Sequence, residues 1–138
     1  MTRGMLTTVL YRMAGEPNIE KEIWGYPFAD VNAEAYYGTA IYWARLNGIA
    51  NGYSDEKFGP DDPITREQLA VILYNYSGSP TSPQTLEGFT DTDKISSYAL
   101  NALCWTVKQG ILQGKGDGVL DPAGQATRAE VAAILQRF

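Results

Sequence analysis

The chain has 138 residues, of which 44% are hydrophobic and 20% are charged, with a formal net charge of −5. This composition is typical of a globular protein, and the acidic balance argues against nucleic acid and anionic membranes as partners. The chain has no histidine and a single cysteine, Cys104, which excludes an internal disulfide and the Ser–His and Cys–His nucleophile pairs. No apolar run approaches the roughly 20 residues that cross a bilayer, so we expect no membrane insertion.

Residues 2–15 are predicted to form an amphipathic helix. Its apolar residues recur at helical spacing on one face: Met5, Leu6, Val9, Leu10 and Met13. The segment does not resemble an export signal, because polar residues interrupt the apolar run and no small-residue cleavage site follows it.

An aromatic residue and an aspartate, Phe28 and Asp30, precede a second predicted helix at residues 33–47. The buried stripe of this helix is predicted to contain Tyr36, Ala40, Ile41 and Ala44. Gly48 follows the last turn, where a residue that adopts positive φ satisfies the free carbonyls. A loop rich in Gly, Pro and Asp comes next. A third helix begins at Thr65, whose Thr-x-x-Gln pattern predicts a capping box.

The same series recurs with an offset of 61 to 62 residues. Phe89 and Asp91 open it, and residues 97–109 form its first predicted helix. Gly110 follows that helix, and Thr127 caps the next one in the pattern Thr-x-x-Glu. The series is therefore an internal repeat of the helix–loop–helix type.

The pair Thr2-Arg3 stands 63 residues before Thr65-Arg66, so the chain holds the second half of one repeat and two whole repeats. A single helix pair leaves an apolar stripe uncovered, and such repeats are therefore expected in stacked sets. The predicted divisions are a half repeat with its linker at residues 1–27, a repeat at 28–78, a linker at 79–88 and a repeat at 89–138.

These repeats resemble the S-layer homology repeat. The resemblance rests on the strings F-x-D-V, A-I-x-W-A, G-I-x-x-G-Y, F-x-P and I-T-R-E between residues 28 and 67, and on A-T-R-A-E at residues 126–130. It implies an all-α fold of tandem helix–loop–helix repeats in a pseudo-threefold helical assembly, here with one repeat incomplete. It also implies a non-catalytic module without a cofactor, which anchors an S-layer or surface protein to the bacterial cell wall.

The resemblance implies as ligand a secondary cell-wall polymer, often a pyruvylated glycan, or a peptidoglycan-linked glycan. A module of this kind works outside the cell, and without an export signal in these residues we expect the chain to be part of a longer protein. Because the first repeat lacks its opening helix, we also expect either self-association as a homodimer or an N-terminal helix that packs differently from its homologous helices. The alternative is an apolar groove beside Leu6, Val9 and Leu10.

The arginine of each Thr-Arg pair is the first candidate for ligand binding: Arg3, Arg66 and Arg128. Each falls at the first helical position, where free amides and the helix dipole favour an anion, and its planar fork suits a carboxylate. The structural alternative is a brace that pairs this arginine with Asp30, Asp91 or Asp55. The resemblance favours contact with the glycan and adds Asp30 and Asp91 to the candidate residues.

Aromatic residues and glycines complete the candidate glycan site. Trp43 and Trp105 could stack on sugar rings, but aromatic residues within a helical stripe more often belong to the core. Tyr53 lies in the loop and is a candidate contact, although Lys115 replaces it in the next repeat. Gly52 and Gly114 would permit close approach of a ligand, and an ordinary turn explains them equally well.

Three other interpretations remain weaker. The acidic residues between Asp55 and Asp62 lack the spacing of a calcium loop, so they are interpreted as solvated turn residues and no metal site is predicted. A glycoside hydrolase would use two carboxylates such as Glu67 and Glu130, but these acids recur with the repeat, whereas an active site is usually asymmetric. A protein–protein oligomerisation module is the remaining alternative.

Overall fold

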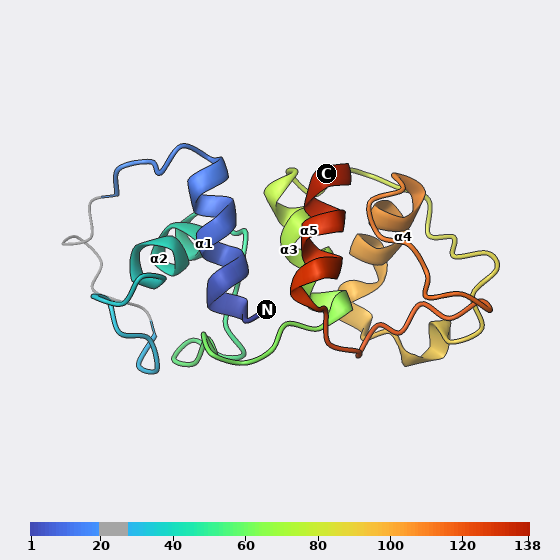
Figure 1. Ribbon diagram of the computed structural model, residues 1–138, viewed down its shortest axis with the longest axis horizontal. Helices are drawn as coiled ribbons and strands as arrows, with labels where there is room; N and C mark the ends of the chain where they lie inside the picture. Colours follow the sequence, from blue (N-terminus) through green and yellow to red (C-terminus); the bar gives the residue numbers. More distant parts are fainter. Residues whose placement is uncertain (20–27) are drawn as a thin grey trace. The chain divides into compact units, whose positions relative to one another are not determined.

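The computed structural model describes residues 1–19 and 28–138. Within these residues the chain forms five α-helices and no strand (Figure 1). The α-helices are α1 (Arg3–Met13), α2 (Gly38–Leu46), α3 (Arg66–Tyr76), α4 (Leu100–Lys108) and α5 (Arg128–Arg137). Two short 3-10 helices, η1 (Thr92–Lys94) and η2 (Ser97–Ala99), precede α4. The predicted all-α fold is confirmed.

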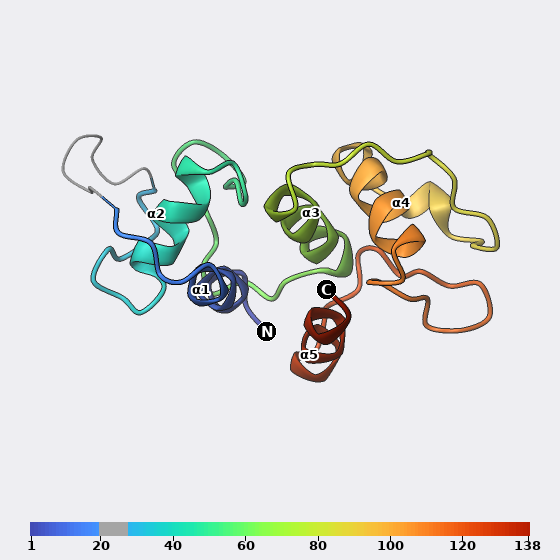
Figure 2. The same ribbon diagram turned by 90° about the horizontal axis from the view of Figure 1, so that it is seen from above.

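The chain folds as two compact units, Met1–Pro63 and Ile64–Phe138. In the first unit α1 packs against α2, and in the second α3 packs against α4, as both ribbon views show (Figures 1 and 2). Helix α3 also contacts η2. Each unit therefore joins the closing helix of one repeat to the opening helix and loop of the next. We call such an opening helix with its loop an opening half; the two described here span residues 28–63 and 89–124.

The helix ends follow from local sequence. Thr65 and Thr127 both form the predicted capping box with the residue at the third helical position, whereas at Thr2 the side-chain hydroxyl accepts from the amide of Met5 and no box is formed. Gly48 and Gly110 have φ of 65° and 71° just beyond α2 and α4, which lets the following amides bond back to the last helical turn. These predictions are confirmed.

The start of the second helix was predicted five residues too early, at residue 33 instead of Gly38. Asn32 begins a turn instead: its side chain accepts from the amide of Glu34, and its carbonyl accepts from the amide of Ala35. As a result Tyr36 lies outside the helix and is 59% exposed, so its predicted place in the buried stripe is wrong. The other stripe residues, Ala40, Ile41 and Ala44, are buried.

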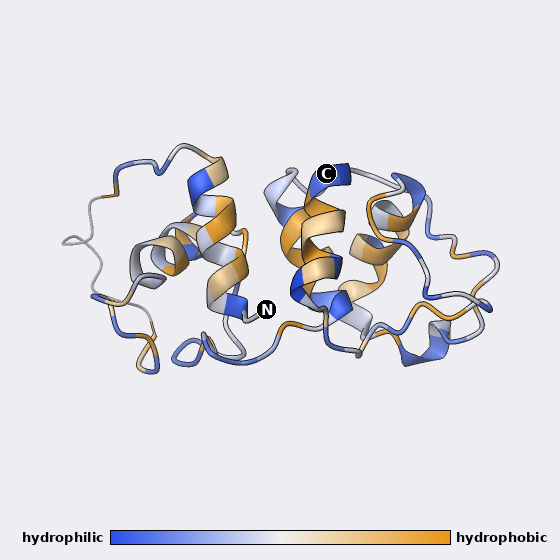
Figure 3. Ribbon diagram, viewed as in Figure 1, coloured by the Kyte–Doolittle hydropathy of each residue, from blue (hydrophilic) through white to orange (hydrophobic). Residues whose placement is uncertain are grey.

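Each unit has a core made from its α-helices, α1 and α2 in the first and α3, α4 and α5 in the second, and from its loop (Figure 3). Leu6 and Leu10 of α1 are fully buried, so the alternative of an apolar groove beside them is wrong. The largest fully buried residues are Leu6, Leu10, Ile41, Tyr42 and Phe58 in the first unit, and Ile64, Leu69, Leu73, Leu103, Leu112, Leu120 and Val131 in the second. The phenylalanine or leucine of each loop thus belongs to the core, and this fixes the loop to the helices.

Candidate functional site

Arg3 is buried in the first unit, with only 4% of its surface exposed. Its Nε donates to the carbonyl of Phe58 and its Nη2 donates to the carbonyl of Asn51, both at 2.9 Å. The guanidinium also lies over the rings of Tyr53 and Phe58, 4.6 and 4.7 Å from their centroids. Arg3 therefore ties the first turn of α1 to the loop that follows α2.

Arg66 occupies the equivalent place in the second unit and is 3% exposed. Its Nε donates to the carbonyl of Leu120 at 2.9 Å, and its Nη2 donates to the carbonyl of Gln113 at 2.6 Å. Burial lowers the pKa of Arg66, against the opposing influence of Glu130, whose carboxylate lies 3.5 Å from Nη1. The brace predicted as the alternative role is present at both arginines, but the main partners are loop carbonyls, not the expected aspartates.

The first helical amides are also bound to the loop. The amides of Arg3 and Gly4 donate to the carbonyls of Asp62 and Pro60. In the second unit the amides of Arg66 and Glu67 donate to Gly124 and Pro122. These are the donors that would otherwise favour an anion at a helix N-terminus. The loop therefore occupies the helix N-terminus, where an anionic ligand was predicted from the sequence.

Asp30 and Asp91 hold the same loops from the other side. Asp30 accepts from the amides of Phe58 and Gly59 at 2.9 and 2.8 Å. Asp91 accepts from the amides of Leu120 and Asp121 at 2.9 and 2.8 Å. The result is that each loop is fixed by one arginine and one aspartate.

These bonds lower the pKa of both carboxyl groups. For Asp30, burial pushes the pKa upward, but the amides of Phe58 and Gly59 and the charge of Lys57 outweigh it, so the net pKa lies below its usual value. For Asp91 the amide of Leu120 is the strongest influence and also lowers the pKa. Both aspartates are therefore held in the charged form.

The accessible edge of each loop carries a polar pair. Tyr53 is 50% exposed, and its hydroxyl donates to Oδ2 of Asp62 at 3.0 Å. At the equivalent place Nζ of Lys115 lies 2.6 Å from Oδ2 of Asp121, and both side chains are partly exposed. We call these four residues the loop rim. Tyr53 was predicted from the sequence as a glycan contact, with Lys115 at its place in the next repeat. No sequence pattern predicted Asp62 and Asp121 as their partners.

Gly52 and Gly114 have a packing role. A Cβ atom at Gly52 would lie 2.4 Å from the carbonyl oxygen of Lys57 and 2.5 Å from the ring of Phe28. A Cβ at Gly114 would lie 2.8 Å from the ring of Phe89. These glycines therefore admit the phenylalanine that opens the repeat.

The two tryptophans belong to the core. Trp43 and Trp105 are 6% and 9% exposed. Each packs against a tyrosine of the preceding closing helix: Tyr11 lies 5.5 Å from Trp43 and Tyr74 lies 5.8 Å from Trp105, between ring centroids. Both tryptophans therefore have a packing role between the closing helix and the opening helix of their unit.

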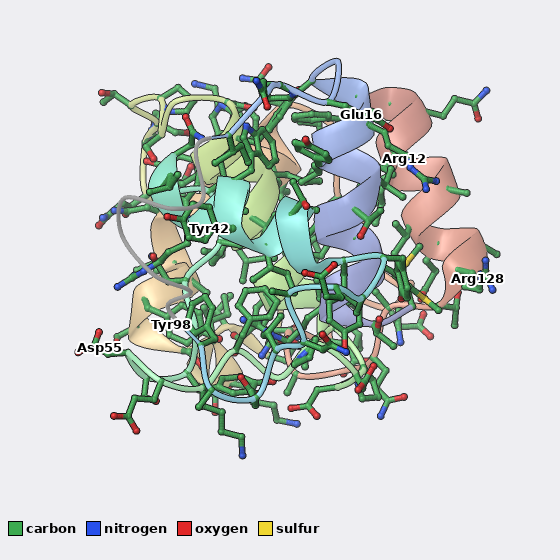
Figure 4. All side chains as sticks on the ribbon, turned by 90° about the vertical axis from the view of Figure 1, so that its left-hand side faces the viewer. Arg12, Glu16, Tyr42, Asp55, Tyr98 and Arg128 are labelled. Atoms are coloured by element: carbon green, nitrogen blue, oxygen red, sulfur yellow. The ribbon has the colours of Figure 1, made fainter. Side chains whose placement is uncertain are left out.

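Arg128 differs from the other two arginines of the Thr-Arg pairs. It is exposed and lies at the outer edge of α5 in Figure 4. Among the described residues its side chain has no hydrogen bond or ion pair. The structure thus brings Arg3, Asp30, Gly52 and Tyr53 together in one unit and Arg66, Asp91, Gly114 and Lys115 in the other, and it leaves Arg128 apart from both groups.

Residues 1–19 and 28–138 offer neither a metal site nor a membrane-spanning helix. No cluster of three or more acidic or cysteine side chains could hold a metal ion there. No helix among those residues is long and apolar enough to cross a bilayer.

Comparison with known sequences places the two whole repeats in one family. The S-layer homology domain matches residues 27–70 and 88–132, which together make up more than half of the chain. The chain is 34% identical to an amylopullulanase of Thermoanaerobacterium thermosulfurigenes over 98% of its own length and 7% of that protein. It is 33% identical to exoglucanase XynX of Acetivibrio thermocellus over 98% of its length and 12% of that protein.

A third relative is named for its place on the cell. The surface-layer 125 kDa protein of Lysinibacillus sphaericus is 31% identical over 80% of this chain and 10% of that protein. The chain therefore spans a small part of each curated relative that it matches.

Proposed function

The chain belongs to the S-layer homology family, whose domain is a non-catalytic anchoring module of cell-surface proteins, and we propose that it binds an anionic secondary cell-wall polysaccharide. In this role it tethers a larger protein to the outside of the bacterial wall. The observation that carries the proposal is the match of two consecutive repeats, each with a loop held by a buried arginine and an aspartate.

We assign direct contact with the glycan to the loop rim. Lys115 supplies a partly exposed cation for a carboxylate such as that of a pyruvylated sugar. Tyr53 supplies a half-exposed ring and a hydroxyl group. Arg3, Arg66, Asp30 and Asp91 contribute by holding the loop in one conformation, which reduces the ordering cost of binding.

The carboxylates considered for hydrolysis already have structural partners. Glu67 is buried and accepts from the amide and hydroxyl of Ser96 and from the hydroxyl of Tyr98. The amide of Thr127 lowers the pKa of Glu130, which also lies beside Arg66. A general acid needs a raised pKa, and Glu130 has the opposite shift.

The proposal is tested by sedimentation of the chain with purified cell wall, intact and after chemical removal of the secondary polymer. We expect binding to intact wall and loss of binding to stripped wall. Equal binding to both would place the ligand in peptidoglycan instead. Absence of binding together with concentration-dependent association in light scattering would favour an oligomerisation module.

A further inference from the structure

Two arginines bind the two carbonyl groups of Asn51 in the loop of the first unit. Nη2 of Arg3 donates to the main-chain carbonyl at 2.9 Å, and Nη1 of Arg45 donates to the side-chain Oδ1 at 3.0 Å. Arg45 is itself paired with Asp55, whose Oδ1 lies 3.6 Å from its Nη2. A guanidinium therefore polarises each carbonyl carbon of this asparagine.

The residue after Asn51 is Gly52, and an asparagine followed by glycine can react with its own backbone. Glycine has no Cβ, so its amide nitrogen can approach Cγ of the preceding side chain. Within residues 1–19 and 28–138 the amide of Gly52 donates no hydrogen bond, and Nδ2 of Asn51 donates none either. Asn51 is also exposed to water. The nucleophile, the leaving group and the solvent are thus all available at this position.

We propose that Asn51 is a site of spontaneous modification, where the chain closes a cyclic imide with Gly52 and water opens it to aspartate or isoaspartate. The amide nitrogen of Gly52 loses its proton to hydroxide and bonds to Cγ of Asn51, while an electron pair moves to Oδ1. The pair then returns, the Cγ–Nδ2 bond breaks, and ammonia leaves with a proton from water. Nη1 of Arg45 faces the oxygen that is negative in this step, and so stabilises it.

The imide carries the same two carbonyl groups that the arginines bind. One is the former main-chain carbonyl beside Arg3, and the other is the former side-chain carbonyl beside Arg45. Addition of water to the side-chain carbon leaves a carboxylate next to Arg45 and gives aspartate. Addition to the main-chain carbon leaves a carboxylate next to Arg3 and gives isoaspartate. Either product therefore pairs a new negative charge with an arginine.

A second Asn-Gly pair, Asn47-Gly48, is an internal control. The amide of Gly48 donates to the carbonyl of Arg45 at 3.2 Å, and Nδ2 of Asn47 donates to the carbonyl of Trp43 at 2.8 Å. The nucleophile and the leaving group are both bound at the end of α2. We therefore expect Asn47 to react much more slowly than Asn51.

The loop of the second unit has different residues at the reacting positions. Gln113 stands in the place of Asn51, and its carbonyl accepts from Nη2 of Arg66 at 2.6 Å. Val107 stands in the place of Arg45. Glutamine cyclises more slowly than asparagine, because its longer side chain must fix one more rotatable bond. Of the two loops, the first should therefore gain a negative charge with age, whereas the second should not.

The test follows the whole chain by mass spectrometry during incubation at mildly alkaline pH, where the glycine amide loses its proton more readily. The tryptic peptide of residues 46–57 contains both asparagines, and fragmentation assigns the mass change of deamidation to one of them. In the folded chain we expect position 51 to react at least about tenfold faster than position 47. In guanidinium chloride, which removes the structure around both pairs, the two rates should become equal.

Three variants test the role of the arginine. Arg45→Ala should slow the reaction at position 51 several-fold in the folded chain and leave the rate in guanidinium chloride unchanged. Gln113→Asn creates an Asn-Gly pair beside Arg66 without a second arginine, and this pair should react more slowly than Asn51. Addition of Val107→Arg to that variant should raise its rate. Circular dichroism confirms that each variant is folded.

Three outcomes overturn the proposal. Equal rates at positions 47 and 51 in the folded chain would show that the fold does not select Asn51. A difference that persists in guanidinium chloride would assign the selection to the local sequence. A rate at position 51 that Arg45→Ala leaves unchanged would remove the guanidinium from the reaction. None of these outcomes concerns wall binding, so failure here and failure of the proposed function are distinguishable.

Discussion

Arg66 and Asp91 bind opposite polar groups of one residue, Leu120. Nε of Arg66 donates to its carbonyl at 2.9 Å, and Oδ1 of Asp91 accepts from its amide at 2.9 Å. In the first unit Arg3 and Asp30 bind Phe58 in the same way. Since Leu120 and Phe58 are fully buried, each loop is fixed at the point where it enters the core.

Replacing Arg66 should therefore cost more stability than replacing Arg128. Arg66→Ala leaves the buried carbonyls of Leu120 and Gln113 without their donor, and we expect a loss of about 3 kcal/mol in the free energy of unfolding. Arg128→Ala removes an exposed side chain and should change that free energy by less than about 0.5 kcal/mol. Urea denaturation of both variants measures the difference. Equal losses would contradict the assignment of Arg66 as the brace.

The lowered pKa of Asp91 predicts a defined dependence of stability on pH. Its folded pKa lies below the ordinary value of 3.8, so the native state binds fewer protons than the unfolded state in that range. The stabilisation is fully present above the unfolded pKa, and it is lost as pH falls through 3.8 to the folded pKa. Asp91→Asn should lower stability at pH 7 and flatten its decline below about pH 5.

Unfolding in urea at several pH values between 7 and 3 checks this prediction. Asp93→Asn is the matched control, because Asp93 is a nearby exposed carboxylate. If the control flattened the curve as much as Asp91→Asn, the two amide bonds to the loop would not be the cause.

Gly52 should tolerate a methyl group less well than Gly48. Alanine at Gly52 would place Cβ 2.5 Å from the ring of Phe28 and 2.4 Å from the carbonyl oxygen of Lys57, so the ring or the loop must move. We expect a loss of about 2–3 kcal/mol. Gly48 has open space around it and needs only its φ of 65°, for which alanine costs about 1–2 kcal/mol. Thermal unfolding of Gly52→Ala and Gly48→Ala ranks the two effects, and a smaller loss at Gly52 would argue against the close packing of Phe28.

The loop rim predicts unequal contributions of the two units to wall binding. Lys115→Ala should weaken binding to intact wall several-fold, chiefly at low ionic strength, because it removes the cation facing an anionic glycan. Tyr53→Ala should weaken binding with less dependence on salt, and Tyr53→Phe should retain the contribution of the ring. Sedimentation with wall measures binding, and circular dichroism confirms the fold. Unchanged binding in all three variants would remove the loop rim from the ligand site.

Much of the fold could be predicted from sequence because the signals are local. The capping boxes at Thr65 and Thr127 and the glycines that end α2 and α4 each depend on neighbours within a few residues. The roles of the arginines could not be predicted, because Arg3 and Arg66 bind carbonyls 47 to 55 positions away in the sequence. No local pattern shows that the helix N-terminus is already occupied by a loop.

A fragment cut at the boundary of a structural unit should unfold more cooperatively than a fragment cut at the boundary of a sequence repeat. Residues 64–138 keep α3 with its opening half, and we expect cooperative unfolding. Residues 79–138 contain a whole repeat but lack Leu69 and Leu73, each of which contributes about 1.5–3 kcal/mol by burial. Their loss is large beside the stability of about 5–15 kcal/mol of an ordinary domain. Chemical denaturation of the two fragments tests this, and equal cooperativity would contradict it.

The division between Pro63 and Ile64 also affects how the number of repeats in a gene of this kind can increase. Each inserted repeat supplies one opening half, which covers the closing helix before it, and one closing helix, which holds the opening half after it. An insertion of one full period therefore restores every existing pair and adds one, wherever in the repeat the break falls. Unequal recombination between repeats thus needs to conserve only the period and not a particular breakpoint.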